Sequence, residues 1–227
     1  MSKLFYRMIF FLLSVCLIFP VTGALAKSPH LVVVDPAHGG LDKGVWLSKK
    51  VSEKDVTLTI ARLLKKDLEK SKNIKVILTR SADKNVSDID RVKIARKAST
   101  DLFVSLHINA GFRRKSSGFE VYFPGFGSPA TGKNSSKEIL KDMVTTKYLN
   151  ESVKLAQIIQ KNMGKVFPRK DRGLRSAPFL VLENLTVPAV VLEIGFATNT
   201  KDKKKLLDKA IQKSIARALA KSIKEFF

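Results

Sequence analysis

Apolar residues along the chain follow two spacings, and the two spacings alternate. Short β-branched or apolar runs predict buried strands, at 32–34, 75–79, 102–108, 118–123, 179–182 and 189–194. Apolar residues recurring every three to four positions predict helices, at 53–70, 89–98, 137–148, 151–166 and 202–227. We therefore expect a single three-layer α/β domain, whose central mostly parallel or mixed sheet of about six strands is flanked by helices.

The first 26 residues follow a different pattern. A positively charged start precedes an apolar run from Met8 to Pro20, and Ala24-Leu25-Ala26 is a small-x-small cleavage site. This order is typical of a secretory signal peptide, so we expect cleavage after Ala26 and an exported catalytic domain at 27–227. An uncleaved membrane anchor is the alternative, but the run is shorter than the about 20 residues of a spanning helix. The single cysteine, Cys16, lies in this segment, so we expect no disulfide in the exported protein.

Charge adds an expectation about partners. Lys and Arg number 42 against 20 Asp and Glu, which gives a formal net charge of +22. Such an excess draws a protein towards polyanions. For an exported protein we expect anionic envelope polymers or lipid head groups, and not nucleic acid. A lysine-rich surface that is merely solvated is the alternative.

Two histidines stand at similar places in the predicted sheet. His38 follows the apolar run 31–34, and His107 follows the run 102–106. Glu53 begins the helix between them. These three side chains could share one ion, since catalytic zinc often takes three protein ligands and leaves one position for water. Spacing alone leaves a structural, hydrogen-bonding histidine as the alternative at each position.

Four segments of the chain resemble the zinc-dependent N-acetylmuramoyl-L-alanine amidases of the type-3 family, the cell-separation amidases. Asp35-Pro36-Ala37-His38-Gly39-Gly40 is similar to the family's Asp-Pro-Gly-His-Gly-Gly signature. The other three segments are Ser52–Leu58, Asp101–Ala110 and Val187–Phe196. Their order and intervals fit the family as well, and the resemblance runs from about residue 31 to the C-terminus.

The resemblance implies roles for four residues. His38, Glu53 and His107 would bind one Zn²⁺, and Glu193 would be the catalytic carboxylate. The implied reaction is hydrolysis of the amide bond between N-acetylmuramic acid and L-alanine in peptidoglycan. Zinc polarises a carbonyl and lowers the pKa of water to about 7, and a carboxylate can carry the proton to the leaving amine. An ion pair with a buried cation is the alternative role for Glu193.

Further residues carry expectations of their own. Asp35 is expected to orient a ligand or its loop as a hydrogen-bond acceptor, with a turn before proline as the alternative. Asn109 is expected to bind substrate or to brace His107. Arg80 and Arg91 are expected to form structural salt bridges, with substrate carboxylates as the alternative partners.

One position departs from the family motif, and three apolar residues have roles that the resemblance does not define. Ala37 stands where the family usually has glycine; a positive φ there would cost about 1 kcal/mol, whereas a negative φ would be tolerated. Trp46 could stack on a sugar or pack in the fold. Phe179 and Leu180 are expected in the core.

Residues 124–150 are expected to form a loop and a short helix. In some relatives an insert at this place blocks the zinc until a partner removes it, so the resemblance implies a protein activator. Glu138 or Asp142 could reach the metal as a plug, and a solvated helix face is the alternative.

Two other functions remain open. The same metal site could serve a zinc peptidase or carboxypeptidase that acts on peptidoglycan stem peptides. A non-catalytic cell-wall binding protein is the second alternative, and the presence of all four polar residues argues against it.

Overall fold

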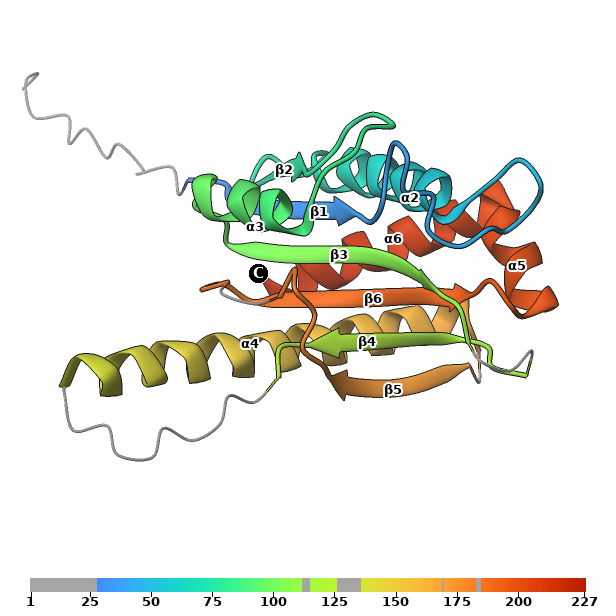
Figure 1. Cartoon of the computed structure of the whole chain (residues 1–227). Helices are drawn as coiled ribbons and strands as arrows, with labels where there is room; N and C mark the ends of the chain where they lie inside the picture. The colour runs from blue at the N-terminus through green and yellow to red at the C-terminus, as the bar shows by residue number, and fades with distance from the viewer. Residues whose placement is uncertain (1–27, 112–114, 126–135, 169, 183–184) are drawn as a thin grey trace, which may run out of the picture.

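The computed structural model describes residues 28–111, 115–125, 136–168, 170–182 and 185–227. Six strands form one sheet in the order β2-β1-β3-β6-β4-β5 (Figure 1). Their bounds are His30–Pro36 (β1), Ile74–Leu78 (β2), Leu102–Asn109 (β3), Phe119–Phe123 (β4), Asp171–Ser176 (β5) and Ala189–Phe196 (β6). Strands β2, β1, β3 and β6 are mutually parallel, β4 is antiparallel to β6, and β5 is parallel to β4. The predicted single α/β domain with a mixed, six-stranded sheet is confirmed.

Helices cover both faces of the sheet. They are α2 (Glu53–Leu68), α3 (Asp88–Lys97), α4 (Ser136–Val166), α5 (Thr200–Leu207) and α6 (Lys209–Phe226). Buried apolar side chains of α2, α4 and α6 pack on one face. Helix α3 and the segments 179–182 and 185–187 pack on the other. Among the described helices, none is long and apolar enough to cross a membrane.

The central strands are apolar throughout because both of their faces are buried. In β1, Val32 and Val34 face α2, whereas Val33 between them packs with Phe103 and Val191 on the α3 side. This continuous burial explains why the sequence marks β1, β3 and β6 so clearly. Their carboxyl ends meet at one edge of the molecule, where parallel sheets commonly build sites.

Two predicted helices are one helix in the structure. We expected helices at 137–148 and 151–166, but α4 runs without a break from Ser136 to Val166. No Gly or Pro lies between the two expected helices, so nothing in the local sequence ends the first one. Within the expected loop 124–136, residues 126–135 lie outside the described ranges, as does the expected signal peptide.

The predicted C-terminal helix 202–227 is divided instead. Asp208 separates α5 from α6 with an extended backbone, φ −78° and ψ 118°. Its carboxylate accepts hydrogen bonds from the backbone N–H groups of Ala210 and Ile211. Asp208 is therefore the N-cap of α6, and a capping residue starts a new helix inside an otherwise helical pattern.

The strand predicted at 179–182 is wrong. Residues 180–182 form a turn, and the sixth strand is β5, at 171–176. Strand β5 has the sequence DRGLRS and lies at the edge of the sheet. A mostly exposed edge strand shows no apolar run, so its pairing with β4 was invisible to hydrophobic patterning.

Candidate metal centre

The structure brings the three predicted ligands together. His38 follows β1, His107 lies near the end of β3, and Glu53 is the first residue of α2. His38 Nε2 lies 3.1 Å from Glu53 Oε1, and His107 Nδ1 lies 3.5 Å from the same oxygen. One donor atom from each residue falls within 4.8 Å of the other two. These two imidazoles and one carboxylate could hold a single cation.

The backbone around His38 has a left-handed conformation at His38 itself and not at Ala37, the position where the sequence analysis considered one. His38 itself has φ 60°, whereas Ala37 is not among the described residues with positive φ. Alanine is therefore tolerated at 37, where it is buried and its N–H donates to the Leu106 carbonyl at 3.1 Å. The left-handed conformation is therefore adopted by the candidate ligand His38, at a cost of about 1–2 kcal/mol.

Gly44 permits the close approach of the loop that follows β1. Its φ is +59°, and a Cβ at this position would lie 2.5 Å from Glu53 Oε2 and 2.6 Å from His38 Cδ2. Any side chain at 44 would thus collide with two of the three ligands. The sequence analysis did not single out this glycine, because nothing local marks a contact with a residue nine positions away.

Glu53 is fixed from both sides. Its Oε1 accepts from the N–H of Ile108 at 2.8 Å, and its Oε2 accepts from the N–H of Val45 at 3.1 Å. Burial by itself raises the pKa of Glu53, but hydrogen bonds from His107 and His38 outweigh this and lower the pKa to about 2. Glu53 is therefore an ionised, immobilised carboxylate, as a metal ligand must be.

The pKa values of the two imidazoles are raised, in contrast to that of Glu53. Burial lowers the pKa of His38, but hydrogen bonds with Glu53 and Asp42 outweigh it and raise the pKa to about 9. For His107, burial is likewise outweighed by the hydrogen bond with Glu53, and the pKa is raised. A metal cation and these protons compete for the same nitrogen lone pairs.

Asp42 orients the His38 ring. Its Oδ2 lies 2.7 Å from His38 Nδ1, which leaves Nε2 directed towards Glu53. Carboxylates commonly hold a metal-binding histidine in this way. Sequence reasoning assigned such a role to Asp35 and missed Asp42, whose place four residues after His38 was the available signal.

Asp35 acts on the loop rather than on the ring. It is fully buried, pairs with Arg91, and accepts a hydrogen bond from Ser105 Oγ at 2.7 Å. Arg91 Nη2 in turn donates to the His38 carbonyl at 2.7 Å. The expected salt bridge of Arg91 is present, and it links Asp35 to the backbone of the ligand loop.

Arg80 differs from its expected role. It forms no ion pair with any described carboxylate, and it donates to the carbonyls of Pro36, Ala37 and Lys54 at 2.8–2.9 Å. The side chain is 1% exposed, so it does not reach a substrate in this structure. Arg80 therefore forms neither the expected salt bridge nor a contact with a substrate carboxylate. Instead, its hydrogen bonds connect the loop after β1 to the start of α2.

Glu193 stands beside the cluster without a partner. It lies on β6 opposite His107 in the strand pairing, is 9% exposed, and its Oε2 has no hydrogen-bond partner among the described residues. The alternative of an ion pair with a buried cation is not found there. Burial raises the pKa of Glu193 to about 7, helped by the negative charges of Glu53 and Glu120 and opposed by His107. A cation bound nearby would lower that pKa.

Glu120 is a buried carboxylate that the sequence analysis missed. It lies on β4 opposite Glu193 and accepts from Arg172 Nε at 2.7 Å and from the Tyr122 hydroxyl at 2.8 Å. Asn109 Nδ2 also reaches it, at 3.3 Å, so Asn109 contacts Glu120 and no hydrogen bond joins it to His107. A glutamate between Phe119 and Val121 in an apolar strand was the overlooked signal.

The expectations for the apolar residues near the site are confirmed in part. The Phe179 ring lies 6.4 Å from the His107 ring and packs against the core, as expected. Leu180 was expected in the core too, but it is 64% exposed in a turn. Trp46 is 55% exposed, which leaves its ring available to a ligand.

The plug hypothesis is not supported for Asp142. Strand β4 is antiparallel to β6, so α4 begins at the end of the molecule opposite to the carboxyl ends of β1, β3 and β6 (Figure 1). Asp142 is an exposed residue near that start. The side chain of Glu138 lies outside the described set.

Taken with the fold, this geometry defines a class. The chain is an α/β protein with a His-Glu-His group that could hold a cation at the carboxyl ends of parallel strands, and a buried, unpaired carboxylate lies beside that group. These are the groups that metal-assisted hydrolysis requires. A family model described as N-acetylmuramoyl-L-alanine amidase matches residues 32–225. The chain belongs to this family of hydrolases.

Individual relatives agree with the family. The N-acetylmuramoyl-L-alanine amidase AmiC of Escherichia coli O6:H1 is 31% identical over 221 residues. The match covers 88% of this chain and 53% of AmiC, so the chain spans about half the length of that relative. The catalytic domain of CwlV, an amidase from Bacillus (Paenibacillus) polymyxa, superposes with a TM-score of 0.71 at 30% identity, covering 87% of this chain and 97% of that one. The CwlD amidase of Clostridioides difficile, solved in complex with the GerS lipoprotein, gives 0.72 at 25% identity, with 87% and 98% covered.

Proposed function

We propose that the protein hydrolyses the amide bond between N-acetylmuramic acid and L-alanine in peptidoglycan, with Zn²⁺ held by His38, Glu53 and His107. The observation that carries the proposal is the convergence of these three donors within 4.8 Å, beside a buried carboxylate with a free oxygen. Two imidazoles and a carboxylate are a donor set that zinc takes in hydrolases. Because Gly44 has no Cβ, the loop after β1 can pack closely against Glu53 and His38 without displacing them.

Zinc in this site would polarise the amide carbonyl and make water a better nucleophile at neutral pH. Glu193 then acts as the proton carrier. Its unpaired oxygen takes a proton from water as the water oxygen adds to the carbonyl carbon. As the C–N bond breaks, Glu193 gives that proton to the nitrogen of the departing L-alanine. A carboxylate that is buried and unpaired is able both to accept and to release it.

Digestion of purified peptidoglycan tests the proposal. The protein is incubated with the polymer with and without a chelator, and the products are identified by mass spectrometry. Stem peptides that begin with L-alanine, released only when metal is present, are the expected products. Shortened stems still attached to glycan would identify a peptidase instead, and intact polymer retained by the protein would identify a binding protein.

We also propose that the protein is exported and acts in the cell envelope. The support is the signal-peptide pattern of residues 1–26 and the family's substrate. Protein isolated from the envelope should begin at Lys27 when its N-terminus is sequenced. A protein activator is part of the proposal too, and the complex of CwlD with a lipoprotein supports looking for one.

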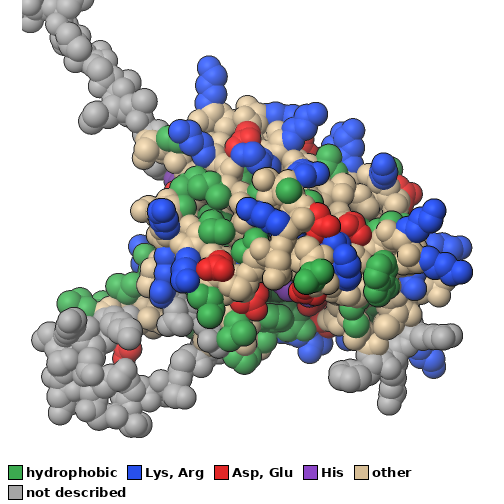
Figure 2. All heavy atoms as spheres, turned by 45° about the horizontal axis from the view of Figure 1, so that its top comes forward, with side chains coloured by type: hydrophobic (Ala, Val, Ile, Leu, Met, Phe, Trp, Pro, Cys, Tyr) green, Lys and Arg blue, Asp and Glu red, His purple; other side chains and the backbone are tan. Residues whose placement is uncertain are grey.

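The positive charge supports a further part of this function, attraction to anionic envelope polymers. Figure 2 shows Lys and Arg side chains at many places on the face that it presents, with hydrophobic and acidic side chains between them. If charge holds the protein to the wall, high salt should weaken its binding to isolated wall. Binding that does not change with salt would reject this part of the proposal.

A further inference from the structure

Helix α6 carries a row of cations along its outer face. Lys209, Lys213, Arg217, Lys221 and Lys224 are all exposed and follow one another at intervals of four, four, four and three residues. This spacing keeps them on one side of a helix, about 6 Å apart along the axis for each interval of four. The opposite side of α6 is buried in the core.

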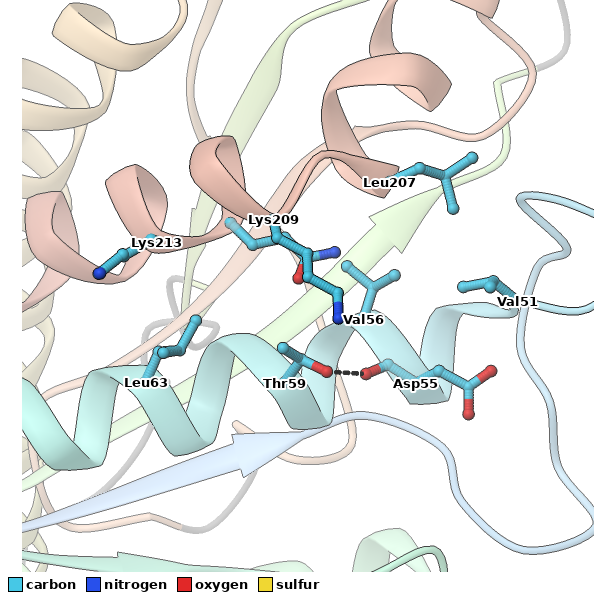
Figure 3. A pocket seen from close by; sticks show the side chains of 9 residues that line it. Val51, Asp55, Val56, Thr59, Leu63, Leu207, Lys209 and Lys213 are labelled. Atoms are coloured by element: carbon cyan, nitrogen blue, oxygen red, sulfur yellow. Dashed lines mark hydrogen bonds between the residues drawn. The ribbon is translucent and has the colours of Figure 1, made fainter.

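Two cavities lie beside this row between α2 and α6, and together they are called the α2–α6 groove. The first has a volume of about 460 Å³ and apolar walls, formed by side chains such as Val56, Leu63 and Leu207. Figure 3 shows Lys209 reaching from α6 towards α2 across this cavity. At the other end of α6, Arg217 lines a second cavity, of about 400 Å³, with Lys70, Lys221 and Lys224.

The acidic side chains of the two cavities are already engaged. Asp55 caps α2 by accepting from the N–H and hydroxyl of Ser52, both at 2.9 Å. Asp67 pairs with Lys70, and Glu225 accepts from Asn162 Nδ2 at 3.1 Å. Among the described residues, by contrast, no carboxylate forms an ion pair with Lys209, Lys213 or Arg217. These three cations are free to bind an external anion.

The shape and the charge of the groove select among anionic partners. The cations form a line of about 22 Å from Lys209 to Lys224. Such a line matches a chain with repeating charges better than a single small anion. Insertion into a membrane requires exposed apolar side chains on the binding face. Every large apolar side chain that is exposed in the described chain lies outside α2 and α6.

We propose that the α2–α6 groove binds a linear polyanion of the cell envelope whose repeating charges are phosphodiesters. Lysine offers such groups a mobile point charge that tolerates an irregular chain. The groove begins at Val51 and Asp55, which flank Glu53, so a bound polymer would hold the metal centre close to the wall. The envelope location rests on the proposed function, but the binding itself requires no turnover.

The test removes three cations from the groove and compares the result with an equal loss of charge elsewhere. The groove variant is K209Q/K213Q/R217Q. The control is K75Q/K84Q/K97Q, three exposed lysines on β2, the following loop and α3. Binding to poly(glycerol phosphate) is measured for both and for the unmodified protein at several salt concentrations, after circular dichroism has shown that all three are folded.

We expect the groove variant to lose at least tenfold in affinity and the control to stay within twofold. The slope of log K against log salt should fall by about 2 for the groove variant, since each lost phosphate contact reduces it by roughly 0.7. Equal losses in the two variants would overturn the proposal in favour of a diffuse effect of net charge.

Two further probes separate the sources of phosphate. Vesicles containing phosphatidylglycerol and a single-stranded oligonucleotide are measured under the same conditions. Tighter binding of either probe than of the polymer would overturn the assignment to an envelope polymer. Hydrolysis is followed separately, so a protein that binds the polymer through this groove but cleaves no peptidoglycan would disprove the proposed function and leave this inference standing.

Discussion

Gly44 determines how closely the loop after β1 can lie against the ligands. Its missing Cβ leaves the space that Glu53 Oε2 and His38 Cδ2 occupy, because a methyl group at this position would lie within 2.6 Å of both atoms. No sequence motif at position 44 indicated that a glycine is required there. Contacts of this kind are set by the tertiary fold. The convergence of His38, Glu53 and His107 could be predicted from the sequence motifs, whereas the glycine that makes room for them could not.

Replacing Gly44 with alanine should therefore damage the metal centre. We expect zinc affinity to fall at least tenfold and stability to fall by about 1–2 kcal/mol, because a residue with a side chain is strained at φ +59° and collides there. Competition with a chelator and denaturant unfolding measure the two effects. Gly164→Ala is the matched control: nothing lies within 4 Å of its added Cβ, and alanine in a helix should stabilise by about 0.5–1 kcal/mol. Similar behaviour of the two variants would contradict this role.

The histidine protons predict how zinc affinity depends on pH. The pKa of His38 is raised to about 9, so below pH 9 zinc must displace a proton from this ring, and the raised pKa of His107 adds to the protons displaced. Affinity should rise with pH, by up to about tenfold per displaced proton and pH unit, and level off once both rings are neutral. Glu53, with a pKa of about 2, adds nothing in this range. Calorimetry in buffers of different ionisation enthalpy counts the protons released, and zero release at pH 7 would refute the assignment.

Glu193 should separate binding from catalysis. Glu193→Gln keeps the size of the side chain but cannot carry a proton, so turnover should fall by about 10²–10⁴-fold, whereas zinc content should stay at one ion per chain. Product release and metal content are measured on the same preparation. Activity that survives in this variant would remove Glu193 from the mechanism, and loss of zinc would make it a ligand instead.

At the scale of elements, the sequence predicted best where burial is complete. Strands β1, β3 and β6 were found because both faces are apolar, and helix α2 because one side is. Strand β5 was missed and a strand at 179–182 was predicted in its place. Whether a short apolar run or a polar segment is a strand depends on the strand with which it pairs, and hydrophobic patterning does not detect such long-range partners.

The break between α5 and α6 depends on one side chain. Asp208→Ala should cost about 1 kcal/mol of unfolding free energy, because it removes the acceptor for two backbone N–H groups at the start of α6. Denaturant unfolding measures the loss. Lys204→Ala, at an exposed position of α5, is the control and should stay within about 0.5 kcal/mol. Equal stability of the two variants would show that packing alone begins α6.

At the scale of the whole molecule, the direction of the strands separates the metal centre from the start of α4. The centre lies at the carboxyl ends of β1 and β3, and α4 begins at the other end of the sheet (Figure 1). The sequence could not place the two relative to each other, because that required knowing that β4 runs antiparallel to β6.

This separation predicts that Asp142 is not a metal plug. Asp142→Ala should leave both zinc affinity and the rate of peptidoglycan hydrolysis within twofold of the unmodified protein, since no path in the fold brings this residue to the ligands. Steady-state digestion and chelator competition provide the measurements. A severalfold gain in rate would mean that α4 adopts a second position over the centre.

The polar sequence of β5, which prevented its prediction as a strand, also affects association between copies of the protein. Strand β5 ends the sheet, and a free edge offers unpaired backbone groups to any strand of a neighbouring molecule. Arg172 and Arg175 lie on this strand with their side chains 35% and 48% exposed, and both pair with Glu120. A short edge strand that carries charged side chains is poorly suited to pair with a strand of a second copy, so we expect this edge to disfavour the growth of one sheet onto another.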